Sequence, residues 1–270
     1  MVQFFKYHGI GNDFIVVDRL SGGAPLDPVV VRLLCARHQG VGADGILSIW
    51  PDVIADARMQ VQNADGSEAE TCGNGLRCVA RFLHDEGKVA DQRAVIVLRD
   101  GAGVHKCERM TSERIRVGMG PPVWRHPDVP YGDVDLQVAE TVIRARCLVL
   151  GNPHAVVFVE DTELEPWSRR FGRDLETHPV FPHRANVSFA AKTDAGFRVV
   201  VHERGVGITL ACASGACAVA AAATARGVWP VGEPMQIELP GGVLTIDVDA
   251  EGQLRQEGEA VRVFTGEVEL

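Results

Sequence analysis

The sequence predicts an α/β (α+β) fold of two pseudo-symmetric domains, each a mixed β-sheet or barrel wrapped around a central helix. Three observations support this class. Short β-branched segments alternate with a few helical ones, local patterns recur at one fixed offset, and each half holds a long helix that follows a cysteine. Prolines cluster just after residue 120, which predicts halves at 1–120 and 121–260.

The first half opens with strands and a capped helix. Its strand segments are β-branched or alternate between apolar and polar residues. They are FIVVD (14–18), ILSIW (46–50) and MQVQN (59–63). DPVVVRLLCARH (27–38) predicts a helix, because Asp27 can cap it and Pro28 suits its first turn.

Each half then contains its central helix. GNGLRCVARFLHDEGK (73–88) has apolar residues at helical spacing, and Gly87 marks its end. In the second half, the strand FRVVVHE (197–203) precedes SGACAVAAAATARG (214–227), a helix that Gly227 ends. Because this Ala-rich helix is apolar nearly all round, we expect it to be buried. The remaining strands are AVIVL (94–98), IRVGM (115–119), TVIRARCLVL (141–150), MQIEL (235–239) and VLTIDV (243–248), the last two joined by a Pro-Gly-Gly turn.

Three local patterns recur at an offset of 140 positions. A Gly-Asn precedes an apolar strand twice, and a polar residue precedes a Gly-bearing loop and a cysteine twice. The equivalent pairs are Asn12 with Asn152, Asn63 with Glu203, and Cys72 with Cys212. Two related halves that face each other would bring these equivalent loops together at their interface.

Composition narrows the function classes. A net charge of −9 argues against a nucleic-acid surface, and no apolar run reaches the roughly 20 residues of a membrane helix. With no signal peptide at the start, we expect a cytoplasmic protein that does not bind membranes. The number of cysteines, seven, is odd, which argues against a disulfide scaffold. Their spacings differ from those of zinc sites, which argues against a bound metal. The lysines lie outside loops suited to a Schiff base, so we expect no cofactor.

Two cysteines, Cys72 and Cys212, stand at predicted helix starts. A helix start exposes unpaired N–H groups and carries roughly +0.5 charge, so it stabilises a thiolate and can bind a carboxylate. Gly73, Gly75 and Gly215 let these amides approach a ligand closely. If the halves face each other, one thiolate removes a proton from a carbon while the other thiol protonates the opposite face. The pattern therefore predicts stereoinversion next to a carboxylate.

Other interpretations of the cysteines are simple burial, oxidation and metal binding. Burial is expected for the five remaining cysteines, since free cysteine is among the most buried residue types. These are Cys35, Cys78, Cys107, Cys147 and Cys217. A disulfide between Cys72 and Cys212 leaves no room for a substrate and would be an inactive oxidised form. A thiol-based metal or redox module is the alternative from another functional class.

Seven motifs occur in an order that covers nearly the whole chain. They are KYHGIGNDFIVVD, ARHQGVGADG, NADGSEAETCGNGLRC, GNPHAVVF, FPHRANVSF, HERGVGITLACASGACA and LPGG. In this order they resemble the diaminopimelate epimerase family. The resemblance implies a homodimeric, cofactor-independent enzyme that interconverts LL- and meso-diaminopimelate for lysine and peptidoglycan synthesis. It also implies that the last strand, 261–270, returns to the first domain.

The resemblance assigns the site residues. Cys72 is implied as proton donor and Cys212 as acceptor in the forward direction, with His154 and Glu203 supporting their ionisation. Arg204 is implied to pair with the distal carboxylate of the substrate. The implied substrate-binding residues are Asn12, Asn63, Gly73, Asn74, Asn152, Asn186, Glu203, Arg204, Ala213 and Ser214.

Several of these residues also have structural interpretations. Asn12 and Asn152 suit turns, Arg204 suits a surface, and His154 suits a core with satisfied ring nitrogens. The chain also departs from the family pattern, and the departures bear on substrate preference. They are Gly45, Ile208 and Ala213. A proline or hydroxyproline racemase is the closest alternative enzyme, and it would have no use for a distal carboxylate partner. Asp65 and Glu68 are expected to shape the loop before Cys72.

Overall fold

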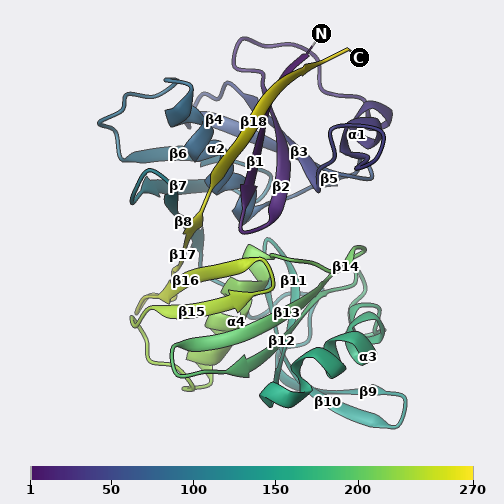
Figure 1. Cartoon of the computed structure of the whole chain (residues 1–270). Helices are drawn as coiled ribbons and strands as arrows, with labels where there is room; N and C mark the ends of the chain where they lie inside the picture. The colour runs from purple at the N-terminus through teal and green to yellow at the C-terminus, as the bar shows by residue number, and fades with distance from the viewer. Residues whose placement is uncertain (1, 270) are drawn as a thin grey trace. The chain divides into compact units, whose positions relative to one another are not determined.

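The computed structural model of the chain describes residues 2–269, and it divides into two compact units (Figure 1). The first unit ends at Val117 and takes in the C-terminal stretch from Glu257. The second unit is Gly118–Gln256. The sequence-based boundaries lie at 120 and 260, within four residues of these divisions.

The first unit is a mixed sheet with two helices. Its strands are β1 (Val2–Gly9), β2 (Asn12–Asp18), β3 (Gly45–Trp50), β4 (Ala57–Asn63), β5 (Glu68–Ala69), β6 (Val95–Arg99), β7 (Val104–Arg109), β8 (Arg114–Gly120) and β18 (Val261–Val268). Its helices are α1 (Pro28–Cys35) and α2 (Gly73–Asp85). The strands pair in the order β18-β1-β2-β3-β4-β6-β7-β8, and β5 pairs with β4. The β2–β3 and β4–β6 pairs are parallel, and the others are antiparallel.

The second unit repeats this plan. Its strands are β9 (Gly132–Val138), β10 (Thr141–Leu150), β11 (Asn152–Val159), β12 (Asn186–Lys192), β13 (Gly196–Glu203), β14 (Gly207–Ile208), β15 (Met235–Leu239), β16 (Gly242–Val248) and β17 (Leu254–Glu259), which leads back to the first unit. Its helices are η1 (Asp161–Glu163), α3 (Leu164–Glu176) and α4 (Ala213–Ala225). The pairing order is β9-β10-β11-β12-β13-β15-β16, with β11–β12 and β13–β15 parallel.

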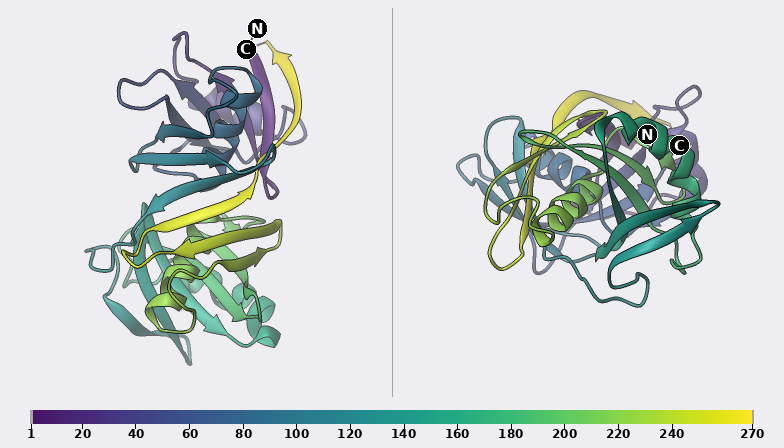
Figure 2. Two further views of the ribbon diagram at one scale, coloured as in Figure 1. Left: turned by 90° about the vertical axis from the view of Figure 1, so that its left-hand side faces the viewer. Right: turned by 90° about the horizontal axis from the view of Figure 1, so that it is seen from below.

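The predicted fold class is confirmed, since each unit wraps a mixed sheet around one helix (Figures 1 and 2). Helix α2 contacts β1, β2, β3, β4, β6, β7 and β18, and α4 contacts β10, β11, β12 and β16. The two helices start and end 140 positions apart, at residues 73 and 213 and at residues 85 and 225. The parallel pairs occur at equivalent places in both units, so the repeat in the sequence is a repeat of structure.

The C-terminal strand belongs to the first unit. Strand β18 pairs antiparallel with β1, from Val2 opposite Val268 to His8 opposite Val261. The chain thus passes from the first unit to the second within β8 and returns within β17.

Most predicted elements lie within two residues of their observed bounds, but the end of the first helix is wrong. The helix begins as predicted, with Asp27 accepting from the amide of Val29, yet it ends at Cys35 rather than at residue 38. The amides of Gly42 and Ala43 donate to carbonyls of the last helical turn, which turns the chain back along the helix. Position 40 must be glycine here, because a Cβ would lie 2.0 Å from the carbonyl oxygen of residue 33.

The core contains the cysteines that were expected to be structural. All five are buried, as the sequence predicts: Cys35, Cys78, Cys107, Cys147 and Cys217. Burial raises the pKa of Cys35 to about 11 and that of Cys78 to about 12. Such thiols stay protonated at neutral pH and are poor nucleophiles.

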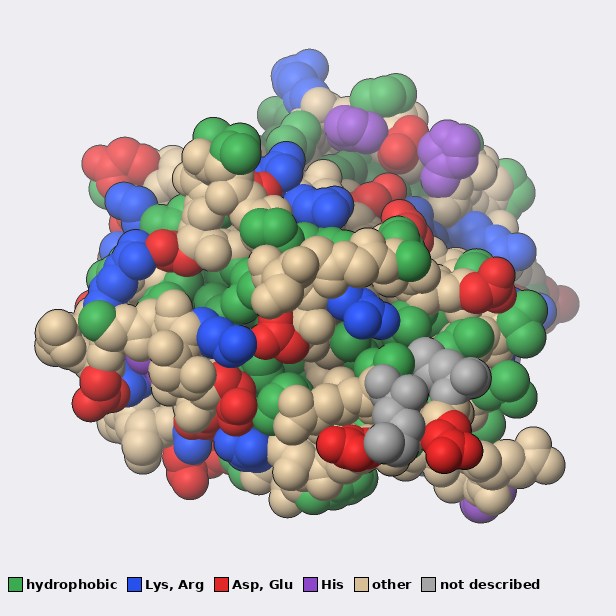
Figure 3. Space-filling view, turned by 90° about the horizontal axis from the view of Figure 1, so that it is seen from above, with side chains coloured by type: hydrophobic (Ala, Val, Ile, Leu, Met, Phe, Trp, Pro, Cys, Tyr) green, Lys and Arg blue, Asp and Glu red, His purple; other side chains and the backbone are tan. Residues whose placement is uncertain are grey.

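The surface is mixed in character. On the face seen in Figure 3, acidic and basic side chains lie interspersed with apolar ones. Within residues 2–269, every helix is too short or too polar to cross a membrane.

Candidate active site

Cys72 caps the central helix of the first unit. Its backbone is extended (φ −146°, ψ 100°), and the amide of Gly75 donates to Sγ at 3.3 Å. The carbonyl of Cys72 accepts from Leu76, which closes the first helical turn. The sulfur therefore takes the place that a Ser or Asp side chain usually takes at an N-cap. There the helix dipole favours negative charge on sulfur.

Cys212 repeats this arrangement in the second unit. Its backbone is again extended (φ −129°, ψ 103°), and the amide of Gly215 donates to Sγ at 3.4 Å. The hydroxyl of Ser214 lies 3.5 Å from the same sulfur. Cys212 is buried, whereas Cys72 is partly exposed. The predicted helix-start positions of both cysteines are confirmed.

The glycine three residues after each cysteine is closely packed. A Cβ at Gly75 would lie 3.0 Å from Leu47 Cδ2, and one at Gly215 would lie 3.2 Å from the sulfur of Cys212. Both contacts are tighter than nearly all real Cβ contacts. The glycines thus let the helix amide approach the sulfur without displacing it.

Asn12 and Asn74 lie side by side in the first unit. Asn74 Nδ2 donates to Asn12 Oδ1 at 3.0 Å, and Asn12 Nδ2 donates to Asp44 Oδ2 at 2.9 Å. Asn74 Oδ1 in turn accepts from Arg77 Nη2 at 2.6 Å. Two predicted binding residues are therefore brought together. Asn12 begins β2, and Asn74 lies in the first turn of α2, next to the Cys72 cap.

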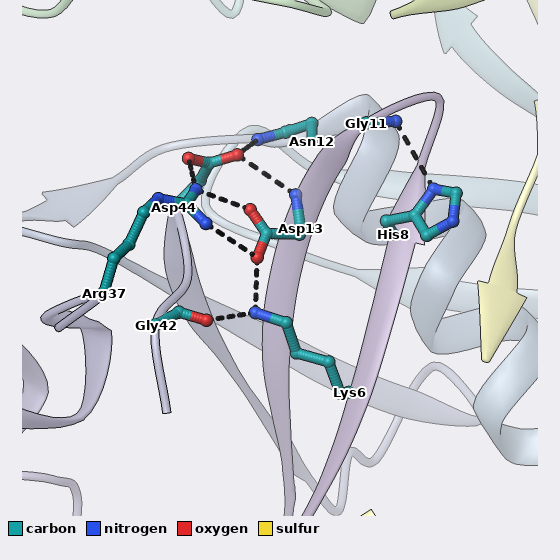
Figure 4. A network of polar contacts seen from close by, with 8 residues as sticks. All are labelled: Lys6, His8, Gly11, Asn12, Asp13, Arg37, Gly42 and Asp44. Carbon is teal, nitrogen blue, oxygen red and sulfur yellow. Dashed lines mark hydrogen bonds and ion pairs between the residues drawn. The ribbon is translucent and has the colours of Figure 1, made fainter. Parts of the chain in front are cut away.

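A charged network supports this end of β2 (Figure 4). Lys6 donates to the Asp13 carboxylate and to the carbonyl of Gly42. Arg37 Nη2 bridges Asp13 and Asp44, at 2.7 Å from each carboxylate. Burial raises the pKa of Asp13, but hydrogen bonds from Arg37 and Lys6 outweigh burial and hold that pKa below its usual value.

Asn63 lies at the end of β4 in a tight polar loop. Its side-chain amide donates to Ser67 Oγ at 3.0 Å, and Asp65 accepts from both the amide and the hydroxyl of Ser67. The hydrogen bonds from Ser67 lower the pKa of Asp65. The predicted role of Asp65 in shaping this loop is confirmed.

In the second unit, Asn186 and Arg204 lie together. Asn186 Oδ1 accepts from the backbone amide of Arg204 at 2.9 Å, and its Nδ2 donates to the carbonyl of Pro153. The next residue is held as well, because Gly205 donates its amide to Glu176 Oε1 at 2.8 Å. Glu176 is 3% exposed, so it anchors the Arg204 turn from inside the unit.

Glu203 and Asn152 are two further predicted site residues of the second unit. The carboxylate of Glu203 accepts from the hydroxyl of Thr209, across the turn that carries Arg204. The side-chain oxygen of Asn152 is buried and has no hydrogen-bond partner within residues 2–269. A buried acceptor in this state needs a partner that a ligand or solvent can provide.

His154 is fully buried in β11, and its two ring nitrogens have no hydrogen-bond partner among the described residues. The alternative interpretation of His154 as a core histidine is therefore right about its burial, but it is wrong in expecting hydrogen-bond partners for the ring nitrogens. Burial, together with the positive charge of Arg204, lowers the pKa of His154 to about 3. The ring is neutral at physiological pH and can either donate or accept one hydrogen bond on each side.

This pKa predicts how stability depends on pH. The unfolded chain binds a proton at His154 as the pH falls through 6.5, while the folded chain does not until about 3. The contribution of His154 to the free energy of unfolding is thus fully present above pH 6.5 and is lost as the pH falls towards 3. From pH 7 to pH 5, the wild type is expected to lose about 2 kcal/mol more unfolding free energy than His154→Gln. Urea unfolding of both proteins at both pH values measures this difference, and parallel losses would contradict it.

Three residues near the site were not predicted from the sequence. Asp44 and Arg77 hold Asn12 and Asn74, and Glu176 holds the turn after Arg204. Asp44 and Arg77 do lie inside motifs that resemble the family. Arg77 stands between apolar neighbours on its helix, Leu76 and Cys78, which was a usable signal, whereas Glu176 had none.

No group of three or more His, Cys, Asp or Glu side chains suited to a metal ion occurs in residues 2–269. The acidic and thiol groups of the site are instead committed to helix caps and to partners within the chain, as described above.

Comparisons with known proteins identify the family. The family model described as diaminopimelate epimerase matches residues 4–125 and 146–270. The chain is 40% identical to the diaminopimelate epimerase of Azoarcus sp. and 40% identical to that of Synechococcus elongatus, over 100% of this chain and 99% of each relative. A solved hydroxyproline epimerase of Agrobacterium vitis, with bound trans-4-hydroxy-L-proline, matches with a TM-score of 0.75. It is 18% identical and covers 98% of this chain and 91% of its own, so it shows a shared fold. The chain belongs to the diaminopimelate epimerase family, and it is an isomerase that acts as an amino-acid epimerase.

Proposed function

We propose that this chain epimerises LL-2,6-diaminopimelate to meso-diaminopimelate without a cofactor, by an acid–base mechanism in which one cysteine removes the α-proton and a second cysteine donates another. The observation that carries the proposal is the repeated cap: Cys72 and Cys212 each accept a helix-start amide at nearly the same distance. Each sulfur lies at a helix start, where a thiolate is stabilised.

In this mechanism, the thiolate of Cys212 removes the α-proton from one face of the substrate carbon. Cys72 then delivers its proton to the other face, and the two roles exchange in the reverse direction. The negative charge that develops on the substrate carboxylate is stabilised by helix-start amides, which include those of Gly73, Asn74 and Ala213. Donors of this kind are worth about 2.7–4 kcal/mol each in other enzymes.

Two of the remaining predicted residues bind the unreactive end of the substrate. Arg204 pairs with the distal carboxylate, and Glu203 accepts from the distal ammonium. Asn152 offers as an acceptor its side-chain oxygen, which has no hydrogen-bond partner among residues 2–269, and His154 supports thiol ionisation as a neutral ring. Asn63 and Asn186 contribute to the same binding site, and Ser214 adds a helix-start amide and a hydroxyl near Cys212.

The biological setting follows from this reaction. We infer a role in lysine and peptidoglycan precursor synthesis, in which meso-diaminopimelate is the useful isomer. The expectations of a cytoplasmic location and a homodimer stay predictions.

An epimerisation assay under reducing conditions tests the proposal. LL-diaminopimelate is expected to be converted, whereas L-proline and L-histidine are not. In D2O, the product isomer is expected to carry deuterium at the inverted carbon from the first turnovers, because its new proton comes from a solvent-exchanged thiol. Conversion of proline in preference to diaminopimelate would assign the chain to a different substrate.

A further inference from the structure

We propose that Asp44 and Arg77 are positioning residues that fix the direction of the Asn12 and Asn74 amides, so that Asn12 presents N–H rather than oxygen to the substrate. This inference rests on the proposed function, because it assigns Asn12 to an anionic part of the bound amino acid. All four residues belong to the first unit.

The four side chains form one continuous run of hydrogen bonds. Arg77 Nη2 donates to Asn74 Oδ1 at 2.6 Å, and Asn74 Nδ2 donates to Asn12 Oδ1 at 3.0 Å. Asn12 Nδ2 then donates to Asp44 Oδ2 at 2.9 Å. Every donor in the run points the same way, from the guanidinium towards the carboxylate.

The two ends of the run decide this direction. A guanidinium has donors only, and a carboxylate has acceptors only, whereas an asparagine amide has one end of each kind. A flipped Asn74 would turn its NH2 towards Arg77, and a flipped Asn12 would turn its oxygen towards Asp44. Each flip sets two like groups against each other and breaks two hydrogen bonds. The second hydrogen on Asn12 Nδ2 is then the donor that Asn12 offers to a ligand, which suits a carboxylate.

Both ends are themselves held in place. Arg77 is fully buried, and its Nε donates to the carbonyl of Glu259 at 3.2 Å. Asp44 accepts from the backbone amide of Asp13 at 3.1 Å and pairs with Arg37 (Figure 4). Gly9 makes room for the guanidinium, because a Cβ at that position would lie 2.9 Å from Arg77 Nη2.

The second unit cannot build the same run. The positions 140 residues later than Asn12, Asp44, Asn74 and Arg77 are Asn152, Arg184, Ser214 and Cys217. There the side-chain oxygen of Asn152 is buried and lacks a hydrogen-bond partner within residues 2–269. The two equivalent asparagines thus differ in character, with Asn12 locked as a donor and the oxygen of Asn152 open to a donor such as an ammonium.

An exchange of the two side chains separates direction from structure. Asn12→Asp places two carboxylates against each other, so its melting temperature is expected to fall. Adding Asp44→Asn removes the repulsion between the two carboxylates and restores the hydrogen bond with residue 12 as acceptor, but it gives up the acceptor of the Asp13 amide. The melting temperature is therefore expected to rise part of the way back. Activity is not expected to return with stability. The KM for diaminopimelate should stay at least about tenfold above the wild-type value, because residue 12 now has only acceptors.

Asp56→Asn, added to Asn12→Asp, is the matched control. Asp56 also accepts from an arginine and a backbone amide, Arg93 and Val97, but it does not contact Asn12. This control is expected to leave the melting temperature of Asn12→Asp low. A double exchange that regains wild-type KM overturns the proposal, as does one that fails to raise the melting temperature. The melting comparison uses no substrate, so it tests the hydrogen-bond run even if the epimerase assay fails.

Discussion

Cys72→Ala and Cys212→Ala are each expected to lower epimerisation of diaminopimelate by about 10³-fold or more, since general acid–base catalysis contributes about 10²–10⁴-fold. Each variant removes one of the two groups that exchange protons with the substrate carbon. Each sulfur stands at a helix cap, where alanine replaces it with a smaller side chain and leaves the helix backbone intact, so the variants should fold and can be assayed. Conversion of the LL isomer, followed by polarimetry or chiral chromatography, measures the loss.

Hydrogen exchange in D2O separates the roles of the two thiols. Cys72→Ala keeps the proposed base, so it is expected to exchange the α-hydrogen of the LL isomer without inverting the carbon. Cys212→Ala should not exchange that hydrogen. Cys35→Ala, which removes a buried thiol of α1, is the control and should keep wild-type turnover. Full epimerisation by either alanine variant would refute the two-cysteine mechanism.

Arg204→Ala is expected to reduce kcat/KM for diaminopimelate by roughly 30-fold to several thousand-fold. Removing one partner of a hydrogen-bonded charge pair at a binding site costs about 2–5 kcal/mol, and about 1.4 kcal/mol corresponds to a factor of ten. The position of Arg204 supports this effect, since Asn186 and Glu176 hold the backbone on either side of it. Steady-state kinetics measure the loss, which should fall mainly on KM.

Two comparisons make the Arg204 result specific. Asn12→Gln should lose much less, because it removes no charge, and Arg198→Ala should behave as the wild type, because Arg198 forms an exposed ion pair with Asp161. Equal losses in Arg204→Ala and Asn12→Gln would count against a distal carboxylate in the substrate. That result would favour a substrate such as proline, which has one carboxylate.

Predictions from local sequence patterns were correct where the structure depends on interactions between residues close in sequence. An N-cap is decided within a few residues, so the spacing of cysteine and glycine was enough to place Cys72 and Cys212 at helix starts. The same holds for Asp27 at the start of α1. The end of α1 was wrong because it depends on how Gly40 packs against the helix, which helical propensity does not describe.

The sequence by itself determined the repeated architecture and the two capping thiols, because both follow from periodicity and from contacts between near neighbours. Only the tertiary structure decided what supports the binding residues. Asp44 lies 32 positions from Asn12, and Glu176 lies 29 positions from Gly205. Such pairs meet only after the sheets form, and many side chains in the sequence could have satisfied each polar group. The folded chain selects one of them by distance and by donor or acceptor character.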